Sequence, residues 1–399
     1  MNKQSPNRKS QQEQQFLSPF GEFKLTRYPQ ENDPTLRAWS AADELLLGYV
    51  RENELLTNSD SNTSLVIAND NFGALSTCLA EFSPSLWSDS YISSQALAFN
   101  LKQNPSTAPE KVAFIPSTAA LPNSVDLTLM QLPKNHHYLA YQLALLTQQL
   151  KNDGLVIAGV MVKHFHKNVL ELFEKYVGPT HTTLAKKKAR LIIAKKANHA
   201  VPFPSTINNK LKLEDFASQY PLERDDLKLV TLPNVFSRDK LDIGTRELLP
   251  HIPKDPSLIS ILDLGCGNGA LGLLAAKLNP NAKVYFCDES YLAIESAKLT
   301  IKQAGLEQQC EFLVTDTTDG APSNLDLILC NPPFHQQSSV HTQIAKRMFK
   351  KSHQHLKPGG HLLVVANRHL SYENALKRCF NTVNKISASK KFIILRAIK

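Results

Sequence analysis

The strongest constraint on the fold of this chain of 399 residues is an internal repeat, with a period of about 200 residues. Residues 65–75 align with residues 261–271, and residues 125–133 align with residues 325–333. In each aligned pair, a short apolar run leads into polar or glycine-rich residues. Such a period is too long for a solenoid repeat and has the size of a duplicated domain.

Each half of the repeat alternates short apolar runs with amphipathic segments, such as residues 270–278 and 292–304. This alternation is typical of βαβ units, in which helices join parallel strands into a doubly wound sheet. The sequence therefore predicts an α/β fold with two tandem, Rossmann-like domains. The predicted parts are a disordered polar tail at residues 1–20, a first domain at 21–196, a linker at 197–204 and a second domain at 205–399.

The positive charge of the chain is concentrated at the ends of the two halves. The net charge is +9, and residues 151–200 carry ten Lys and Arg against three Asp and Glu, whereas residues 351–399 carry ten against one. Basic surfaces of this kind suit the phosphates of nucleic acid. Solvated lysines on helix faces and edge strands are the alternative explanation, and charge alone leaves both open.

Composition also argues against several classes of protein. No apolar run reaches the roughly 18 residues of a membrane-spanning helix, and the Gln-rich beginning lacks the apolar middle of a signal peptide. We therefore expect a cytoplasmic protein. The six cysteines are scattered without a C-x-x-C pair, so we expect neither disulfides nor a metal site.

A glycine-rich loop follows the first apolar run of the second half, and Asp263 precedes it. Glycines permit positive φ and let backbone N–H groups approach a nucleotide-like ligand closely. Asp288 and Asp316 follow the next two apolar runs, where carboxylates can accept hydrogen bonds from ribose hydroxyls and from an adenine amine. The loop consists of Gly265, Cys266, Gly267, Asn268 and Gly269.

A second motif, Asn331-Pro332-Pro333-Phe334, follows the apolar run at residues 325–330. The Asn oxygen can accept a hydrogen bond from an exocyclic amine, Pro has no N–H to compete, and Phe can stack on a planar base. The motif predicts chemistry on an amino group of a nucleobase or an amide. A dehydrogenase needs no such group, yet the loop and Gly272 also match G-x-G-x-x-G, so an NAD-binding oxidoreductase stays an alternative.

Taken together, these motifs resemble those of the S-adenosyl-L-methionine-dependent class I methyltransferases. The segment 263–269 resembles their cofactor loop, Asp288 their ribose-binding acid, Asp316 the residue beside the adenine, and residues 331–334 the catalytic motif of amino methyltransferases. More narrowly, the tandem layout and three segments resemble the RlmG/RsmC family of ribosomal RNA guanine-N2 methyltransferases. These segments are residues 331–335, residues 234–244 and residues 366–370.

The resemblance implies transfer of a methyl group from S-adenosyl-L-methionine to a guanine N2 amine, without a metal. Residues 36–44 and 391–399 resemble the members that act on large-subunit 23S rRNA, and a 16S rRNA enzyme is the alternative. A protein-glutamine or DNA-adenine methyltransferase is a more distant alternative. The resemblance also implies that Phe236 and Gly244 form a wall of the cofactor pocket. Oligomeric state is open, with a monomer as the working assumption.

Several basic residues are candidates for RNA contacts. Arg368 and His369 follow an apolar run of the second half, and His335 follows the catalytic motif. For His335, a structural role or a contact with RNA phosphate is expected rather than base catalysis. The first half contributes the basic segment Lys186, Lys187 and Lys188.

The first half has lost the residues of the cofactor chemistry. Ile67, Asn69 and Asn71 stand where the second half has Asp263, Gly265 and Gly267, and Gln131-Leu132-Pro133-Lys134 replaces the catalytic motif. We expect this degenerate half not to bind the cofactor. RNA recognition is the favoured role for it, and support of the active half is the alternative.

Overall fold

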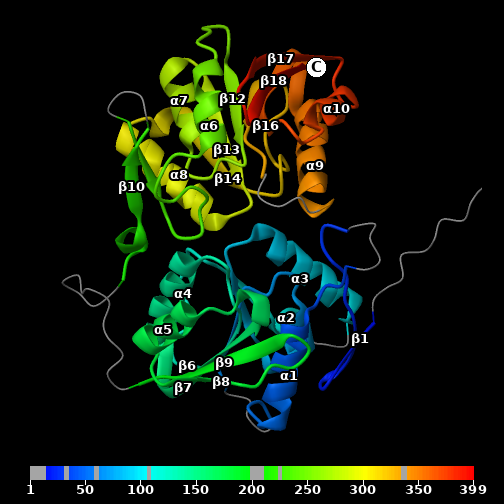
Figure 1. The fold of residues 1–399 in the computed structure, drawn as a ribbon, viewed down its shortest axis with the longest axis vertical. Coiled ribbons are helices and arrows are strands. Elements are labelled where there is room, and N and C mark those ends of the chain that lie inside the picture. Colours follow the sequence, from blue (N-terminus) through cyan, green and yellow to red (C-terminus); the bar gives the residue numbers. More distant parts are fainter. Residues whose placement is uncertain are drawn as a thin grey trace, which may run out of the picture. The chain divides into compact units, whose positions relative to one another are not determined.

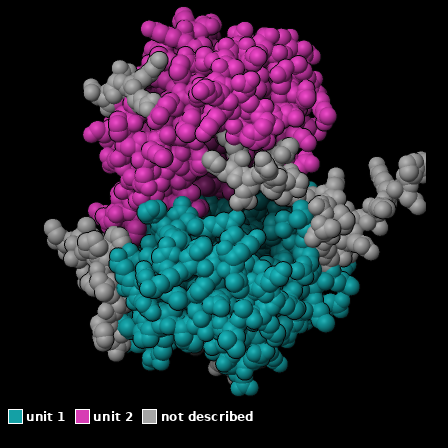
Figure 2. Space-filling model, viewed as in Figure 1, with its two compact units in different colours: residues 1–211 teal, residues 212–399 magenta. Residues whose placement is uncertain are grey.

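The computed structural model of the chain describes residues 15–30, 36–57, 63–105, 109–197, 211–222, 227–333 and 339–399. It divides the chain into two compact units, residues 1–211 and residues 212–399, which Figure 2 distinguishes by colour. Each unit contains one seven-stranded sheet, and the two sheets have the same strand order (Figure 1). The duplicated α/β fold predicted from the repeat is confirmed.

In the first unit the sheet order is β5-β4-β3-β6-β7-β9-β8. The strands are β3 (Leu65–Ala68), β4 (Ser85–Ser88), β5 (Ala113–Pro116), β6 (Val125–Gln131), β7 (Leu150–Met161), β8 (Thr180–Thr182) and β9 (Ala189–Lys195). The helices are α1 (Ala41–Glu52), α2 (Ala74–Cys78), α3 (Tyr91–Gln103), α4 (His136–Gln149) and α5 (Lys167–Tyr176).

In the second unit the order is β14-β13-β12-β15-β16-β18-β17. The strands are β12 (Ser260–Leu264), β13 (Lys283–Asp288), β14 (Cys310–Val314), β15 (Leu325–Cys330), β16 (Leu356–Asn367), β17 (Thr382–Ala388) and β18 (Phe392–Ile398). The helices are α6 (Ile243–Leu248), α7 (Ala270–Leu278), α8 (Tyr291–Ala304), α9 (Ser339–His355) and α10 (Tyr372–Lys377). A hairpin of β10 (Ser218–Pro221) and β11 (Lys228–Thr231) precedes them.

The sheets are mixed rather than wholly parallel. β9 runs antiparallel to both β7 and β8, and β18 runs antiparallel to both β16 and β17. Short connections join β8 to β9 and β17 to β18, and a short connection can only produce an antiparallel pair. The sequence prediction of parallel βαβ units therefore holds for the first five strands of each sheet but not for the last pair.

Apolar layers cover both faces of the second sheet, as a doubly wound sheet requires. Neighbouring residues of one strand belong to opposite layers, because successive side chains of a strand point to opposite faces. Ile261 packs in the layer that contains residues of α7 and α8, whereas Leu262 packs in the layer that contains residues of α9 and α10. No described helix is both apolar enough and long enough to traverse a bilayer.

The end of the predicted tail needs correction. Residues 15–18 form strand β1 (Gln15–Ser18), which pairs with β2 (Gly21–Lys24), so the predicted tail at residues 1–20 extends too far. The reason is Phe16, which is 3% exposed and packs against Trp39 with ring centroids 4.6 Å apart. The predicted linker at 197–204 lies outside the described residues except for Ala197, so its bounds stay a prediction.

The packing of Phe16 predicts a measurable difference between neighbouring substitutions. Phe16→Ala should lower the free energy of unfolding of the first unit by about 3 kcal/mol, because it empties a buried aromatic site. Leu17→Ala is the matched control, since Leu17 is 83% exposed, and it should change stability by less than about 0.5 kcal/mol. Urea unfolding followed by tryptophan fluorescence reports on this unit, because Trp39 and Trp87 both lie in it. Equal effects of the two substitutions would contradict the burial of β1.

Candidate active site

The glycine-rich loop lies between β12 and α7, at the carboxyl end of a central strand. Gly265, Gly267 and Gly269 have φ values of 71°, 54° and 82°, which other residues rarely adopt. The backbone N–H groups of Gly265 and Cys266 donate to the carbonyl oxygen of Cys287, at 2.8 and 3.0 Å. The loop is therefore fixed to β13. Apart from Gly267 and its two chain neighbours, none of the described residues has an atom within 4 Å of the position that a Cβ of Gly267 would take.

Asp263 lies beneath this loop rather than at its surface. It is 1% exposed, and its Oδ2 accepts a hydrogen bond of 2.8 Å from the backbone N of Gly272 in the first turn of α7. Burial raises the pKa of Asp263 to about 8. A side chain at Gly272 would not fit, because its Cβ would lie 2.2 Å from the ring of Phe286. We therefore assign Asp263 to the positioning of the loop.

Asp288, the last residue of β13, holds the loop from its other side. Its Oδ2 accepts from the backbone N of Gly267 at 2.9 Å, and its Oδ1 accepts from the backbone N of Ser290 at 3.0 Å. Burial raises the pKa of Asp288, although these backbone hydrogen bonds oppose the shift. The side chain is partly exposed, at the strand end where the sequence predicts a ribose contact.

Asp316 follows β14 and forms an ion pair within the second unit. Its Oδ1 lies 2.5 Å from a terminal guanidinium nitrogen of Arg347 on α9. Burial raises the pKa of Asp316, and the Arg347 charge opposes that shift. Sequence reasoning missed Arg347, which lies in a basic helix without a recognisable motif.

The remaining predicted cofactor residues lie in the loop, in the segment after β11 and in α6. Asn268 is 6% exposed and donates from Nδ2 to Tyr220 Oη and Thr231 Oγ1, at 2.8 and 2.9 Å, so it ties the loop to the β10–β11 hairpin. Phe236 is 50% exposed on the segment after β11. Two further predicted residues are buried, namely Cys266 in the loop and Gly244 in α6.

Asn331 directly follows β15 and is held by the start of α6. Its Nδ2 donates to Asp242 Oδ2 at 3.0 Å and to Thr245 Oγ1 at 2.9 Å. Asp242 caps this helix, because its Oδ2 also accepts from the backbone N of Thr245. The Oδ1 atom of Asn331 is buried and has no hydrogen-bond partner among the residues that the structure describes. A buried acceptor without a partner is costly, so this atom is a candidate for binding a ligand donor.

Only part of the predicted catalytic motif, residues 331–333, lies within the residues that the structure describes. Pro332 is buried and Pro333 is exposed, whereas Phe334 and His335 lie outside the described residues. Sequence reasoning did not assign Asp242 and Thr245 as partners of Asn331. The only local signal for them is the Asp-x-x-Thr pattern of a helix N-cap, which indicates a helix start but not its contact with a distant strand.

The predicted RNA-contact residues lie on exposed segments. Arg368 and His369 follow β16, and Arg368 Nη1 donates to the carbonyl oxygen of Ser389 at 3.2 Å. Lys186, Lys187 and Lys188 form the exposed turn between β8 and β9. Within this turn, Lys187 is ion-paired with Glu44 at 2.7 Å.

The first unit keeps two of the three positive-φ positions of the loop, and it has asparagine side chains where two of the glycines lie. Asn69 and Gly73 have positive φ values of 62° and 73°, as Gly265 and Gly269 do in the second unit. The Asn69 amide exchanges two hydrogen bonds with that of Gln142, at 2.8 and 2.9 Å. The expectation that this unit does not bind the cofactor therefore has a structural basis, although it stays a prediction.

The arrangement in the second unit suits a nucleoside-like ligand beside an amine. The loop and Asp288 lie at neighbouring strand ends, β12 and β13, while Asn331 follows β15 on the other side of β12. An amine donor could satisfy Asn331 Oδ1, the one atom of the amide without a partner. Among the described residues, no group of three or more His, Cys, Asp or Glu side chains is placed to hold a metal ion.

Comparison with known proteins gives matches over nearly the whole chain. The family model "RLMG N-terminal domain" matches residues 13–198, and "Methyltransferase small domain" matches residues 226–396. The "Ribosomal RNA large subunit methyltransferase G" of Pseudoalteromonas translucida is 40% identical over 385 residues, which cover 94% of this chain and 96% of that protein. The protein of the same name from Vibrio vulnificus is 41% identical over 382 residues, with the same coverage.

A solved structure resembles both units at once. It is the T. thermophilus 16S rRNA N2 G1207 methyltransferase (RsmC) in complex with AdoMet and guanosine. The TM-score is 0.73 at 18% sequence identity, and the match covers 97% of each chain. At this identity the similarity concerns the fold, and it confirms the tandem arrangement of two Rossmann-like domains.

The burial of Asp263 predicts an unusual pH dependence of stability. In the unfolded chain this carboxyl ionises near about pH 4, whereas the folded state retains the proton up to about pH 8. The folded state therefore binds more protons than the unfolded state, so this contribution to stability is full below about pH 4 and is lost as pH rises towards 8. Asp263→Asn should flatten the dependence between pH 5 and pH 8.

Calorimetry of the full chain, read at the unfolding transition of the second unit, measures this effect. Glu307→Gln serves as the control, because Glu307 is an exposed carboxyl group of the same unit. A variant Asp263→Asn that keeps the slope of the unsubstituted protein would show that Asp263 ionises normally in the folded state.

Proposed function

The chain belongs to the ribosomal RNA large subunit methyltransferase G family, and we propose that it methylates the exocyclic N2 amine of a guanosine in 23S rRNA. The methyl donor is S-adenosyl-L-methionine, and the products are N2-methylguanosine and S-adenosylhomocysteine. The observation that carries this proposal is the buried, unpartnered Oδ1 of Asn331 at the end of β15. Family membership favours the large-subunit substrate over 16S rRNA.

The residues of the second unit fit the cofactor. The positive φ of Gly267 and the open space beside its Cα leave backbone accessible, which suits close approach of a nucleoside. Residues 265–269 and Asp288 would hold the ligand, with Asp316 beside the adenine and with Phe236 and Gly244 as a wall. When bound, S-adenosyl-L-methionine supplies an electrophilic methyl group on a sulfonium.

Asn331 acts by positioning the amine. Asp242 and Thr245 take up both hydrogens of its side-chain amide, which directs Oδ1 away from them. In our proposal Oδ1 accepts one hydrogen of the guanine amine, and the backbone carbonyl of Pro332 accepts the other. The nitrogen lone pair, delocalised into the purine ring, is then aimed at the methyl carbon, and positioning supplies most of the acceleration.

The target base must leave its RNA stack to reach Asn331, because a stacked amine is out of reach. Phe334 would stack on the extruded guanine, next to the exposed Pro333. The proton of the amine leaves to water after transfer, so the mechanism needs neither a metal nor a strong base.

The first unit, in our proposal, contributes to RNA recognition. The turn of Lys186, Lys187 and Lys188 is exposed, and its cations suit contacts with phosphates. Arg368 and His369 would add contacts from the second unit, where they are exposed at the end of β16. The expected partner is 23S rRNA.

A direct test compares two asparagines of the second unit. Incubation with 23S rRNA and labelled cofactor should give N2-methylguanosine, located by mass mapping, and little product on 16S rRNA. Asn331→Ala should lower kcat by roughly 100-fold or more, by analogy with the loss of one transition-state hydrogen bond. Asn384→Ala, at an exposed position of β17, should retain full activity.

Calorimetric titration should show nearly unchanged cofactor affinity in Asn331→Ala, because the substitution leaves residues 265–269 intact. Turnover by this variant at the rate of the unsubstituted protein would remove Asn331 from the mechanism. Product on 16S rRNA but not on 23S rRNA would contradict the assignment of 23S rRNA as the substrate.

The partners of Asn331 provide a second prediction. Thr245→Val keeps the shape of the side chain but removes the hydroxyl that holds the amide, so Asn331 can rotate. We expect kcat to fall by roughly 5-fold with the KM for cofactor unchanged, because one hydrogen bond contributes about 1 kcal/mol. Thr382→Val, on the exposed end of β17, is the control. An unaltered kcat in Thr245→Val would mean that Asp242 alone orients the amide.

A further inference from the structure

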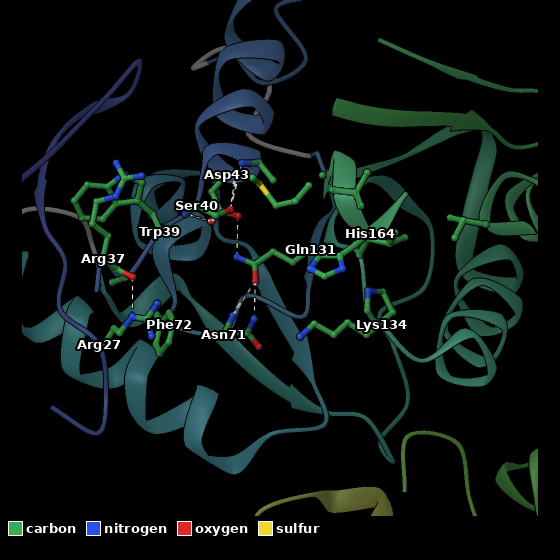
Figure 3. A pocket seen from close by; sticks show the side chains of 18 of the residues that line it. Arg27, Arg37, Trp39, Ser40, Asp43, Asn71, Phe72, Gln131, Lys134 and His164 are labelled. Carbon is green, nitrogen blue, oxygen red and sulfur yellow. Dashed lines mark hydrogen bonds between the residues drawn. The ribbon is translucent and has the colours of Figure 1, made fainter. Parts of the chain in front are cut away.

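The first unit contains a pocket at the carboxyl ends of its own strands. The pocket has a volume of about 340 Å³ and is lined by residues that follow β3, β6 and β7 and by the first turn of α1 (Figure 3). Its lining includes Gln131, the last residue of β6, which aligns with Asn331 of the second unit. The first unit thus has a cavity at the carboxyl ends of its strands, the place where the candidate site of the second unit lies.

Hydrogen bonding in the pocket differs from that in the second unit. Gln131 Nε2 donates to Asp43 Oδ1 at 2.8 Å, which parallels the contact of Asn331 with Asp242. However, Gln131 Oε1 accepts from Asn71 Nδ2 at 3.0 Å, so the oxygen that is free in Asn331 is occupied here. The pocket therefore cannot position an amine in the same way, and any ligand must be recognised by other groups.

One wall of the pocket consists of two arginine–aromatic pairs. The guanidinium carbon of Arg27 lies 4.8 Å from the ring centroid of Phe72, and that of Arg37 lies 5.3 Å from the ring centroid of Trp39. Arg27 Nε donates to the carbonyl oxygen of Arg37 at 2.8 Å, which links the pairs. Guanidinium groups and aromatic rings both offer flat faces for a base, and guanidinium groups also bind phosphate.

The other wall adds further cations. Lys134 and His164 are exposed and lie across the pocket from Arg27 and Phe72 (Figure 3). Partial burial and the neighbouring Lys163, Lys134 and His166 charges lower the pKa of His164, which is the effect expected in a positive potential.

The carboxylates in and beside the pocket offset only part of this positive charge. Asp43 is 1% exposed, and its oxygens accept from Ser40 and Gln131. Glu44 forms ion pairs with Lys187 and Arg37, at 2.7 and 3.4 Å. The lysine turn adjoins the pocket, because Lys188 O accepts from the backbone N of Val162 directly after β7. The pocket therefore offers flat and cationic surfaces together, and the ligand that matches both is a nucleotide.

We propose that this pocket binds one nucleotide of the RNA substrate, with the base against the arginine–aromatic wall and the phosphate at Lys134 on the opposite wall. Its assignment to RNA rests on the proposed function, whereas its nucleotide chemistry rests on the lining residues. The first unit would thus read a second, unmethylated nucleotide while the second unit acts on the target guanosine.

Tryptophan fluorescence offers a direct test. Trp39 lines the pocket, Trp87 is fully buried, and the second unit contains no tryptophan. Guanosine and uridine 5′-monophosphates should quench Trp39 saturably in the full-length protein, and guanosine without phosphate should bind more weakly. Lys134→Gln should weaken the monophosphate affinity several-fold, whereas Lys102→Gln, an exposed lysine at the end of α3, should not change it. Absence of quenching by either monophosphate would overturn the proposal.

A second measurement distinguishes RNA from free nucleotides. Lys134→Gln should lower the slope of log affinity for 23S rRNA against log salt by about 0.7, the value for one phosphate contact with a single strand. The KM for rRNA should rise while kcat stays constant, since Lys134 lies outside the second unit. Quenching by monophosphates without any change in rRNA affinity would indicate a free-nucleotide site and overturn the assignment to RNA.

The two proposals can fail separately. If the unsubstituted protein methylates 23S rRNA but Lys134→Gln changes neither quenching nor affinity, the pocket proposal fails and the proposed function stands. If the monophosphates quench Trp39 but no N2-methylguanosine forms, the proposed function fails while the nucleotide site stands.

Discussion

The functional residues of this chain all depend on one constraint of parallel sheets. Two consecutive strands can be parallel only if the chain between them returns to the amino end of the strands, here through a helix. Consequently the carboxyl ends of all parallel strands lie on the same side of the sheet. The residues that follow β12, β13, β14 and β15 therefore lie together there, although more than sixty residues separate the first from the last. Both the loop and Asn331 owe their proximity to this arrangement.

The two units show how the same edge can be given different chemistry. In each, a side-chain amide at the carboxyl end of a central strand, β6 or β15, donates to a carboxylate at the start of a helix. The difference lies in the neighbour of the amide oxygen. Gly267 presents no side chain, whereas Asn71, at the aligned position in the first unit, donates to Gln131. The side chain of Asn71 therefore occupies the amide oxygen in the first unit, where the neighbouring cavity is lined by cations and aromatic rings.

The sequence predicted the repeat, both sheets and the positions of the motif residues, because apolar runs and glycines are local signals. It did not predict contacts between distant segments. The role of Asp242 depends on the contact of α6 with the end of β15, and the burial of Phe16 depends on its contact with Trp39. Neither contact corresponds to a periodic pattern or a fixed spacing in the sequence. The inward position of Asp263 also escaped detection, since an acid at a strand end looks the same whether it faces a ligand or the helix beneath the loop.

The strand order has a consequence for folding during synthesis. β9 lies between β7 and β8 although it follows both in the chain, and β18 is placed in the same way between β16 and β17. Until the late strand is made, the earlier neighbour presents an open, apolar edge that can pair with any strand of similar pattern. β9 and β18 are two such strands in one polypeptide, and both pair with seven residues of their neighbours. The first unit must therefore complete its sheet before β18 emerges, or the duplicated chain risks exchanging strands between its halves.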